Sequence, residues 1–305
     1  MTKQKTVDIH GVPSDLGANI RGANMGPAAI RISRLKQKIE ELGYGVEDHG
    51  DLKIPIRDAL SEQERDSHYF SSIYTLCKDL AARTYESTKA GKIPLSLGGD
   101  HSLAIGSVAG VGKAFMEEKK KLGLIWVDAH ADINTPDSTE SGNIHGMPLA
   151  TLLGQGHDKL VNLVGKGPCL DAAHTVLIGI RTIDKVEKEI LKKSGITFFT
   201  MRDIDERGMY AIMQEALKVS CEATDGLHLS FDIDGIDPVY APGVSTPVPG
   251  GLKFREAHLL LEMIAETKKL TSMDFVELNP YTDVGPTSAN LTVELILSAL
   301  GKSII

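Results

Sequence analysis

The segment LGLIWVDAHAD, residues 122–132, decides the fold class, because an unbroken apolar run leads directly into three ionisable side chains. A continuous apolar run is typical of a strand that is buried on both faces of a parallel sheet. The same arrangement recurs in IPLSLGGDHS (93–102), LHLSFDIDGIDP (227–238) and MDFVELNP (273–280). Ligands of open parallel sheets bind beyond the carboxyl ends of the strands, so we expect the four polar clusters to meet at one edge.

Eight short apolar runs are predicted to form strands, and longer segments with helical periodicity lie between them. The predicted strands are Thr6–Val12, Gly45–Gly50, Ile93–Leu97, Gly123–Val127, Thr175–Gly179, Ile196–Thr200, Leu227–Phe231 and Met273–Glu277. The clearest helical segments are Pro27–Leu42, Tyr69–Ala90 and Met209–Ala223. This alternation predicts a single α/β domain over residues 1–305, a three-layer sandwich with an eight-stranded, mostly parallel sheet and helices on both faces.

Two long stretches, Thr135–Met147 and Asp237–Leu252, show no clear period and are rich in Gly, Pro, Ser, Thr and Asn. Loops of this length within a compact domain are usually functional or disordered. Both stretches directly follow a run of acidic residues, which makes a functional role the preferred interpretation.

The overall charge of the chain excludes some partners. Acidic residues outnumber basic ones by 41 to 33, and the net charge of −8 disfavours nucleic acid and mildly favours a cationic small molecule. Cys77, Cys169 and Cys221 form no CxxC pair, which fits a reducing compartment. Since there is neither a signal-like apolar segment at the start nor a run of membrane-spanning length, we expect a cytoplasmic protein without a membrane partner.

The spacing of the acidic residues points to metal ions. Asp128, His130 and Asp132 lie at i, i+2 and i+4, and Asp232 and Asp234 at i and i+2, so in extended backbone each set points to one side. Each set alone also fits a solvated turn. Four carboxylates gathered at one edge repel one another, however, and divalent cations remove that cost. Oxygen-rich donors with some imidazole suit two Mn²⁺ ions that share carboxylates better than one tetrahedral zinc.

The chain resembles the ureohydrolase superfamily over nearly its whole length. The motifs that carry the resemblance are GGDHS (98–102), DAHADINTP (128–136), SGNIHGMP (141–148), SFDIDGIDP (230–238) and VELNP (276–280), with RGANMGPAAIR (21–31) and STPVPGG (245–251). The segments DINTP and SGNIHGMP are similar to arginases in particular. The resemblance implies an arginase-like fold and hydrolysis of L-arginine to L-ornithine and urea by a hydroxide that bridges two Mn²⁺ per subunit.

The resemblance also implies a role for each motif residue. One Mn²⁺ would be held by His101, Asp128, Asp132 and Asp232, and the other by His130, Asp128, Asp232 and Asp234. The implied catalytic residues are His145 as a proton shuttle, Glu277 as the partner of the guanidinium group, and Asp132 as the residue that orients the hydroxide. His145 also fits an inconsequential loop histidine, and Glu277 an acid paired with a lysine.

The substrate's α-carbon groups would be bound by a second set of residues. The resemblance assigns Asn134, Ser141 and Asn143 to the α-carboxylate, Asp184 and Glu187 to the α-amino group, and Thr246 to the wall of the site. Asn134, Ser141 and Asn143 also fit turn-capping residues. The superfamily implies a homo-oligomer, either a trimer or a hexamer.

Several other residues are interpreted as structural. Trp126 is expected in the core, and His10, His49 and His228 lie in or beside predicted strands. Arg255 and Glu256 begin the helix after the last long loop; an ion pair between subunits fits them, but a solvated helix face is the simplest interpretation.

Three alternative functions remain open at this point. The first is hydrolysis of another guanidine, such as agmatine or guanidinobutyrate, although agmatine would leave the α-carboxylate groups of the site unpaired. The second is a metal-containing arginine-binding protein without turnover. The third is a deacetylase-like zinc hydrolase, which six ligands in the order of a two-metal site disfavour.

Overall fold

All eight apolar runs form strands of one parallel sheet, as predicted. The structure is a computed structural model that describes residues 5–303. The strands are β1 (Thr6–Gly11), β2 (Gly45–Asp51), β3 (Ile93–Leu97), β4 (Leu122–Val127), β5 (Thr175–Ile180), β6 (Thr197–Thr200), β7 (Gly226–Asp232) and β8 (Leu270–Val276). Their order across the sheet is β2-β1-β3-β8-β7-β4-β5-β6, and every neighbouring pair is parallel.

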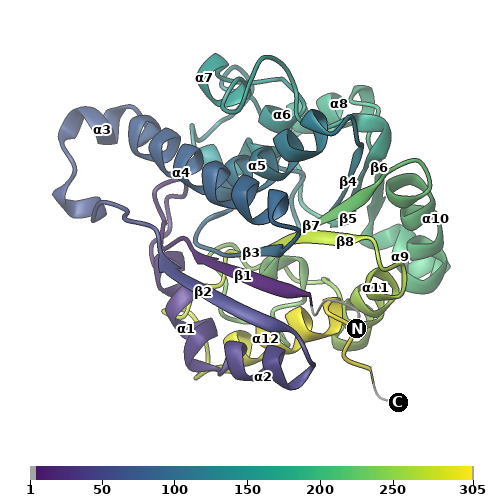
Figure 1. Cartoon of the computed structure of the whole chain (residues 1–305). Coiled ribbons are helices and arrows are strands. Elements are labelled where there is room, and N and C mark those ends of the chain that lie inside the picture. The colour runs from purple at the N-terminus through teal and green to yellow at the C-terminus, as the bar shows by residue number, and fades with distance from the viewer. Residues whose placement is uncertain (1–4, 304–305) are drawn as a thin grey trace.

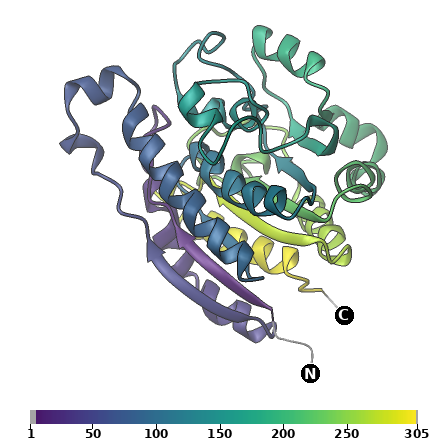
Figure 2. The ribbon, with the colours of Figure 1, turned by 45° about the horizontal axis from the view of Figure 1, so that its top comes forward.

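Helices cover both faces of the sheet, which confirms the three-layer arrangement (Figure 1). They are α1 (Gly26–Ile32), α2 (Leu35–Glu41), α3 (Glu62–Asp66), α4 (Phe70–Lys89), α5 (Ala104–Glu117), α6 (Pro148–Leu152), α7 (Asp158–Val161), α8 (Lys185–Lys193), α9 (Met201–Arg207), α10 (Met209–Cys221), α11 (Phe254–Glu266) and α12 (Thr287–Ala299). Helices α4, α5 and α6 lie on one face, while α1, α2, α10, α11 and α12 lie on the other. Figure 2 shows α4 running along β1. No helix within residues 5–303 is long and apolar enough to cross a membrane.

The chain order places the last two strands at the centre of the sheet. β1 to β3 build one half, β4 to β6 build the other, and β7 and β8 fill the gap between β3 and β4. The carboxyl ends of β3, β8, β7 and β4 are therefore adjacent, although they come from distant parts of the sequence. This is the edge at which a doubly wound sheet binds its ligands.

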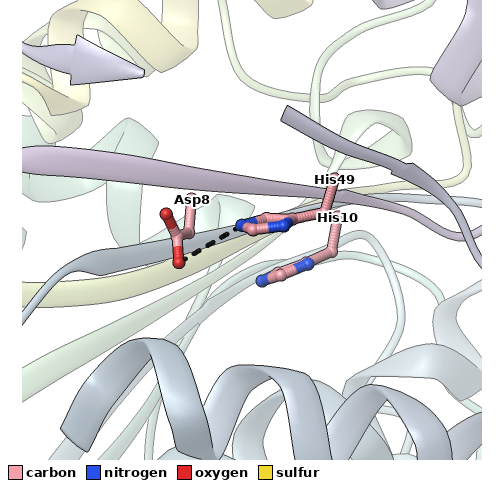
Figure 3. A group of neighbouring side chains, drawn as sticks. All are labelled: Asp8, His10 and His49. Carbon is pink, nitrogen blue, oxygen red and sulfur yellow. Dashed lines mark ion pairs between the residues drawn. The ribbon is translucent and has the colours of Figure 1, made fainter. Parts of the chain in front are cut away.

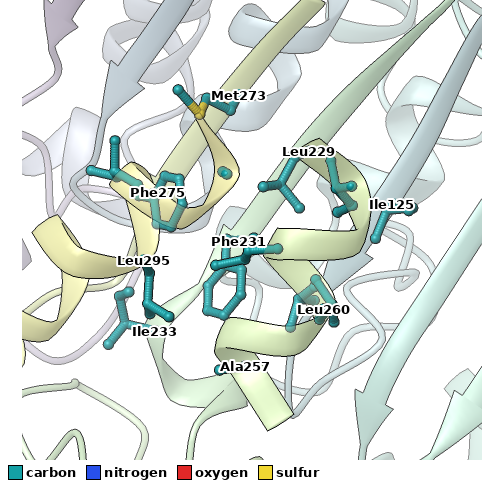
Figure 4. Packing of buried hydrophobic residues seen from close by; sticks show 14 of the residues in the cluster. Ile125, Leu229, Phe231, Ile233, Ala257, Leu260, Met273, Phe275 and Leu295 are labelled. Atoms are coloured by element: carbon teal, nitrogen blue, oxygen red, sulfur yellow. The ribbon is translucent and has the colours of Figure 1, made fainter. Parts of the chain in front are cut away.

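The two central strands are anchored by aromatic packing. Phe231 of β7 and Phe275 of β8 stack with ring centroids 5.3 Å apart, and both are fully buried. Leu260 of α11 and Leu295 of α12 belong to the same buried cluster (Figure 4). Burying an aromatic or aliphatic side chain of this size contributes about 2 kcal/mol. The strands that lead to Asp232, Asp234 and Glu277 are therefore held in place by the hydrophobic core.

One helix prediction is wrong. Pro27–Leu42 is not continuous, because it divides into α1 and α2 at Arg34, whose φ is +66°. A left-handed residue redirects the chain, since a right-handed helix cannot pass through it. The predicted helices Tyr69–Ala90 and Met209–Ala223 are confirmed as α4 and α10.

Candidate metal centre and active site

The carboxyl ends of four strands carry the predicted metal ligands and Glu277, whereas His145 lies in η4 (Ile144–Gly146) of the loop after β4. His101 follows β3 in the short helix η3 (His101–Leu103), and Asp234 follows β7 in η6 (Ile233–Gly235). Asp232 caps η6, with its Oδ1 accepting a hydrogen bond from the backbone N–H of Asp234 at 2.7 Å. This cap turns the chain immediately after β7 and brings the two aspartates to the same edge.

The geometry expected for residues 128–132 is corrected by the structure. β4 ends at Val127, and Asp132 has a φ of +50°, so the segment is not extended. The backbone N–H of His130 donates to Asp128 Oδ1 at 2.7 Å in a tight turn. Asp128, His130 and Asp132 do converge, but a turn and a left-handed residue bring them together instead of strand alternation.

A first cluster of ligand atoms surrounds His101. Its Nδ1 atom lies 3.1 Å from Asp128 Oδ2, 3.0 Å from Asp132 Oδ2 and 3.2 Å from Asp232 Oδ2. All four side chains are buried, and Nδ1 has no hydrogen-bond partner of good geometry. Ligands at adjacent corners of an octahedron are about 3.1 Å apart when metal–ligand bonds are about 2.2 Å. Each oxygen thus lies at a distance from Nδ1 that suits neighbouring ligands of one cation, and the ligand atoms of His101, Asp128 and Asp232 all lie within 4.8 Å of one another.

A second cluster shares Asp128 with the first. His130 Nδ1 lies 3.3 Å from Asp128 Oδ1 and 3.2 Å from Asp234 Oδ2. Asp128 thus directs one oxygen to each cluster, which is the arrangement of a carboxylate that bridges two ions. Its Oδ2 also accepts a hydrogen bond from Trp126 Nε1 at 3.1 Å, so the buried indole predicted for the core also positions a ligand.

The electrostatics of the two clusters fit divalent cations. Burial and the charges of Asp234 and Asp128 raise the pKa of Asp232 well above its ordinary value. Burial and Asp128 together raise the pKa of Asp132 to about 6. Burial opposes protonation of His130, but the carboxylates of Asp234 and Asp128 raise its pKa to about 12. Without cations, protons must balance this excess of negative charge, and cations at the same positions would replace them.

His145 and Glu277, the two residues predicted to act in catalysis, lie beside the candidate metal clusters. His145 Nδ1 is 3.1 Å from Glu277 Oε1, which also accepts a hydrogen bond from the backbone N–H of His101 at 2.9 Å. Burial opposes protonation of His145, but Glu277 raises its pKa to about 9. Glu277 has a φ of +62°, and its Oε2 is buried without a hydrogen-bond partner. That unpaired oxygen is available to a cationic ligand.

A cavity of about 250 Å³ joins the clusters to most of the predicted substrate residues. Its walls include His130, Asp132, Asn134, His145, Asp184, Glu187, Asp232, Asp234, Thr246 and Glu277. Asn134 Nδ2 donates to Asp184 Oδ2 at 3.0 Å, and Thr246 Oγ1 donates to Asp234 Oδ2 at 2.7 Å. Ser141 and Asn143 lie outside this lining and contact each other, since Asn143 N donates to Ser141 Oγ at 3.2 Å. His101 and Asp128 lie deeper, beneath the cavity wall.

Comparison with known proteins connects this site to one enzyme family. A model of the Arginase family matches residues 5–301. The arginase of Bacillus caldovelox is 44% identical over 302 residues, which cover 99% of this chain and 100% of the relative. Its crystal structure superposes with a TM-score of 0.94, again at 44% identity and with 99% and 100% of the two chains covered.

The chain belongs to the arginase family. It is a metal-dependent hydrolase of the ureohydrolase superfamily. A more distant structure is that of the Entamoeba histolytica arginase in complex with L-ornithine. It is 30% identical and has a TM-score of 0.89, and the match covers 99% of this chain and 100% of that one.

A buried network behind the arginase-family metal centre was not predicted from the sequence. Ser230 Oγ donates to Asp274 Oδ1 at 2.5 Å and lies 2.9 Å from His101 Nε2. Because the single hydroxyl proton goes to Asp274, His101 Nε2 must donate to Ser230, and Nδ1 is left for an ion. His228, interpreted as structural, holds Asp274 from the other side through Nε2 at 2.8 Å. The only sequence signal was the i, i+2 spacing of Ser230 and Asp232.

Arg181 is a second residue that the sequence did not reveal. Its guanidinium donates to backbone carbonyls of Asp234 (2.6 Å) and Val248 (2.7 Å), and thereby ties the long loop 237–252 to the metal edge. The neighbouring Thr182 and Ile183 line the cavity. Arg255 pairs with Glu262 of the same helix at 3.0 Å.

Proposed function

We propose that this arginase-family hydrolase converts L-arginine and water to L-ornithine and urea. The observation that supports this most directly is Glu277 Oε2, a buried carboxylate oxygen without a partner beside a cavity whose floor is two His/Asp clusters. A guanidinium group is the planar cation that best satisfies such a carboxylate.

The proposed cofactor is two Mn²⁺ ions per subunit. His101, Asp128, Asp132 and Asp232 would hold one, and His130, Asp128, Asp232 and Asp234 would hold the other. When bound, the ions supply Lewis acidity that makes a water-derived nucleophile available near neutral pH. The donor set supports this choice, because carboxylates with two imidazoles and no thiolate suit Mn²⁺.

Glu277 would bind and orient the guanidinium. Its Oε1 is held by the backbone N–H of His101 and by His145, which leaves Oε2 to accept hydrogen bonds from the substrate. Burial makes this charge-assisted contact stronger than it would be in water, because the surrounding dielectric is low. The central carbon of the guanidinium is then fixed next to the nucleophile, and this positioning lowers the barrier.

His145 would provide the proton that the departing amine needs. With a pKa of about 9, it is protonated at neutral pH, and it lies on the cavity wall. As the C–N bond to ornithine breaks, the nitrogen takes the proton from the imidazolium, which then recovers one from solvent. Asp132, at the boundary between His101 and the cavity, would orient the attacking oxygen.

The α-carbon groups of arginine would contact the outer wall. Asn134, together with Ser141 and Asn143 of the adjoining loop, would bind the α-carboxylate. Asp184 and Glu187 would bind the α-amino group, and Thr246 would line the pocket. Burial and Asp132 raise the pKa of Glu187 to about 7. An ammonium group bound there would stabilise the ionised carboxylate, which supports this assignment.

The organisation of the protein completes the proposal. Residues 1–305 form one catalytic domain that assembles into a trimer or hexamer in the cytoplasm. Val239, Tyr281 and Val284 are 81%, 82% and 71% exposed, and such apolar residues support an interface. Cys77, Cys169 and Cys221 form no disulfide, which fits a reducing compartment. Light scattering on the purified protein measures the assembly size.

The decisive experiment offers Mn²⁺-loaded protein L-arginine, agmatine and guanidinobutyrate in parallel and measures urea. Urea from arginine alone is expected, because only arginine pairs the groups assigned to both α-substituents. Preference for agmatine would reject those subsites while leaving the metal centre intact. No urea from any of the three, with metal bound, would reject the catalytic proposal in favour of a binding protein.

A further inference from the structure

A third cluster of potential metal ligands, Asp8, His10 and His49, lies on β1 and the edge strand β2, away from the candidate active site; we call it the edge cluster. Asp8 and His10 occupy alternate positions of β1 and so share a face of the strand. Asp8 pairs with Glu47 and Ile9 with Asp48, so His49 of β2 comes beside His10. The two imidazole rings stack with centroids 4.9 Å apart, and His49 Nε2 lies 3.5 Å from Asp8 Oδ2 (Figure 3).

The ligand atoms of this cluster are close enough for one ion. Each of Asp8, His10 and His49 offers an oxygen or nitrogen within 4.8 Å of the others. Ligands of a tetrahedral site are about 3.3 Å apart when the bonds are about 2.0 Å. A metal ion lies in the plane of each imidazole that binds it, so one of the two stacked rings must turn out of the stack before both can bind one cation.

The hydrogen bonds of His10 leave its Nδ1 atom without a partner. Ser87 of α4 donates its hydroxyl proton to Asp8 Oδ2 at 2.8 Å, and its oxygen lies 3.1 Å from His10 Nε2. Since the hydroxyl has one proton, His10 Nε2 must be the donor in the second contact. His10 Nδ1 then carries a bare lone pair, and it is buried without a hydrogen-bond partner. A metal-binding histidine has this arrangement, with its other N–H donated to a fixed acceptor.

The protonation state of His10 agrees with the geometry. Burial and the neighbouring His49 lower the pKa of His10 to about 4, with Asp8 acting in the opposite direction. The imidazole is therefore neutral at physiological pH. A neutral imidazole is the form that coordinates metals.

A cavity gives access to the cluster. About 610 Å³ of space is bounded by Asp8, His10, His49, Arg83, Glu86 and Lys92, among others. It shares no lining residue with the catalytic cavity. The side chain of His49 is 41% exposed, so an ion can enter and keep water in its remaining coordination position.

We infer that Asp8, His10 and His49 form a site for one Zn²⁺ ion that is separate from the catalytic metal centre. Two imidazoles and one carboxylate form a nitrogen-rich donor set, which suits zinc. The donor set of the candidate metal centre is richer in oxygen and suits zinc less well. The ion would crosslink the half-exposed edge strand β2 to β1. This goes beyond the proposed function and does not depend on arginine turnover.

Lys92 provides an independent probe of this site. Its Nζ lies 3.2 Å from Asp8 Oδ1 and 2.8 Å from Glu47 Oε2, so its positive charge faces the carboxylate that the zinc ion would use. Removing the ammonium removes a competitor for Asp8. We expect Lys92→Gln to bind zinc about tenfold more tightly.

The main experiment counts metal ions in full-length protein that is saturated with Mn²⁺ and then dialysed against micromolar ZnCl₂. Elemental analysis is expected to give one metal ion per chain fewer in His49→Gln than in the wild type, whatever number the catalytic centre holds. His174→Gln is the matched control, because His174 also has a buried, unpartnered Nδ1 but belongs to no ligand cluster among residues 5–303. Equal metal counts in the wild type and His49→Gln would overturn the inference.

Thermal unfolding and urea release provide the second measurement. Zinc is expected to raise the melting temperature of the wild type and of His174→Gln by about 5 °C at saturation, and to have no such effect on His10→Asn or His49→Gln. All variants are expected to release urea from arginine at the wild-type rate when loaded with Mn²⁺, which shows that they fold. A zinc shift that persists in His10→Asn and His49→Gln, or a Lys92→Gln variant that binds zinc no more tightly than the wild type, would contradict the site.

Discussion

Two buried histidines, His10 on β1 and His101 in η3 beyond the end of β3, make the same kind of hydrogen bond and yet have pKa values shifted in opposite directions. His101 Nε2 faces Ser230, which donates to Asp274, and His10 Nε2 faces Ser87, which donates to Asp8. In both cases Nδ1 is buried without a hydrogen-bond partner. The pKa of His101 is raised well above its ordinary value, whereas that of His10 is lowered to about 4.

The difference comes from the charges around each ring. Burial disfavours protonation of both, but three carboxylates within 3.2 Å overcome it at His101. At His10, burial, His49 and Arg83 lower the pKa and outweigh the opposite effect of Asp8 and Asp48. A serine–aspartate pair thus fixes the ring of a histidine, while the number of nearby carboxylates decides whether it attracts a proton. The four predictions below test this comparison, beginning with the largest expected effect.

Asp128→Asn should abolish catalysis by removing the carboxylate that both clusters share. Losing one charged ligand from each cluster is expected to release metal and to lower kcat by more than about 10⁴-fold. Metal analysis and urea release measure the two effects. Asp8→Asn, the equivalent change at the edge cluster, should leave kcat unchanged, and a comparable loss of kcat there would show that the two regions are not independent.

Glu277→Ala should separate substrate binding from metal binding. Loss of the guanidinium partner is expected to lower kcat/KM by about 10³-fold while metal content stays at the wild-type level. Glu277→Gln, which keeps an acceptor for the backbone N–H of His101, is the control for local structure. If the metals leave together with the activity in both variants, Glu277 supports the metal centre and does not bind the substrate.

The low pKa of His10 predicts acid sensitivity in metal-free protein. Between pH 6.5 and about 4 the unfolded chain binds a proton at His10 that the folded chain does not, so the free energy of unfolding falls as the pH falls. The drop over this window is expected to be at most about 3 kcal/mol.

Denaturant titrations at several pH values measure this effect, and His10→Asn should flatten the curve in that window. The groups facing His10 are His49, Asp8, Arg83 and Asp48, and the variant retains all of them. An unchanged slope in His10→Asn would assign the acid sensitivity to other groups.

Ser230→Ala and Ser87→Ala test the shared serine device with the smallest expected effects. Each change removes the hydroxyl that orients a histidine ring. It should weaken metal affinity at its own site by about tenfold, which is the smallest effect usual for the loss of a residue that orients a metal ligand. Ser230→Ala is expected to weaken Mn²⁺ binding and Ser87→Ala to weaken only Zn²⁺ binding. If either serine variant weakened both metals equally, the effect would be one of general stability.

Much of the catalytic edge could be predicted from local sequence. All eight strands were predicted from the sequence, and the signal is clearest for β3, β4, β5 and β7, because a strand buried on both faces leaves a continuous hydrophobic run. The polar residues that follow IPLSL, LGLIWV, LHLSF and MDFV do meet at one edge, since parallel strands all present their carboxyl ends there. His101, His130 and the aspartates were therefore accessible to sequence reasoning.

The edge cluster was decided by tertiary structure alone. His10 and His49 were interpreted as structural from the sequence and Asp8 was not singled out, because neither strand's sequence shows which residues pair across the two strands. The register of β1 with β2 and the placement of Ser87 on α4 bring them together. The break at Arg34 and the turn at Asp132 were equally hidden, since left-handed backbone at a non-glycine residue is imposed by surrounding contacts. The sequence by itself determined the strands and the catalytic edge, because these depend on hydrophobicity and chain direction; pairing register and local backbone depend on packing between distant segments, which only the folded chain specifies.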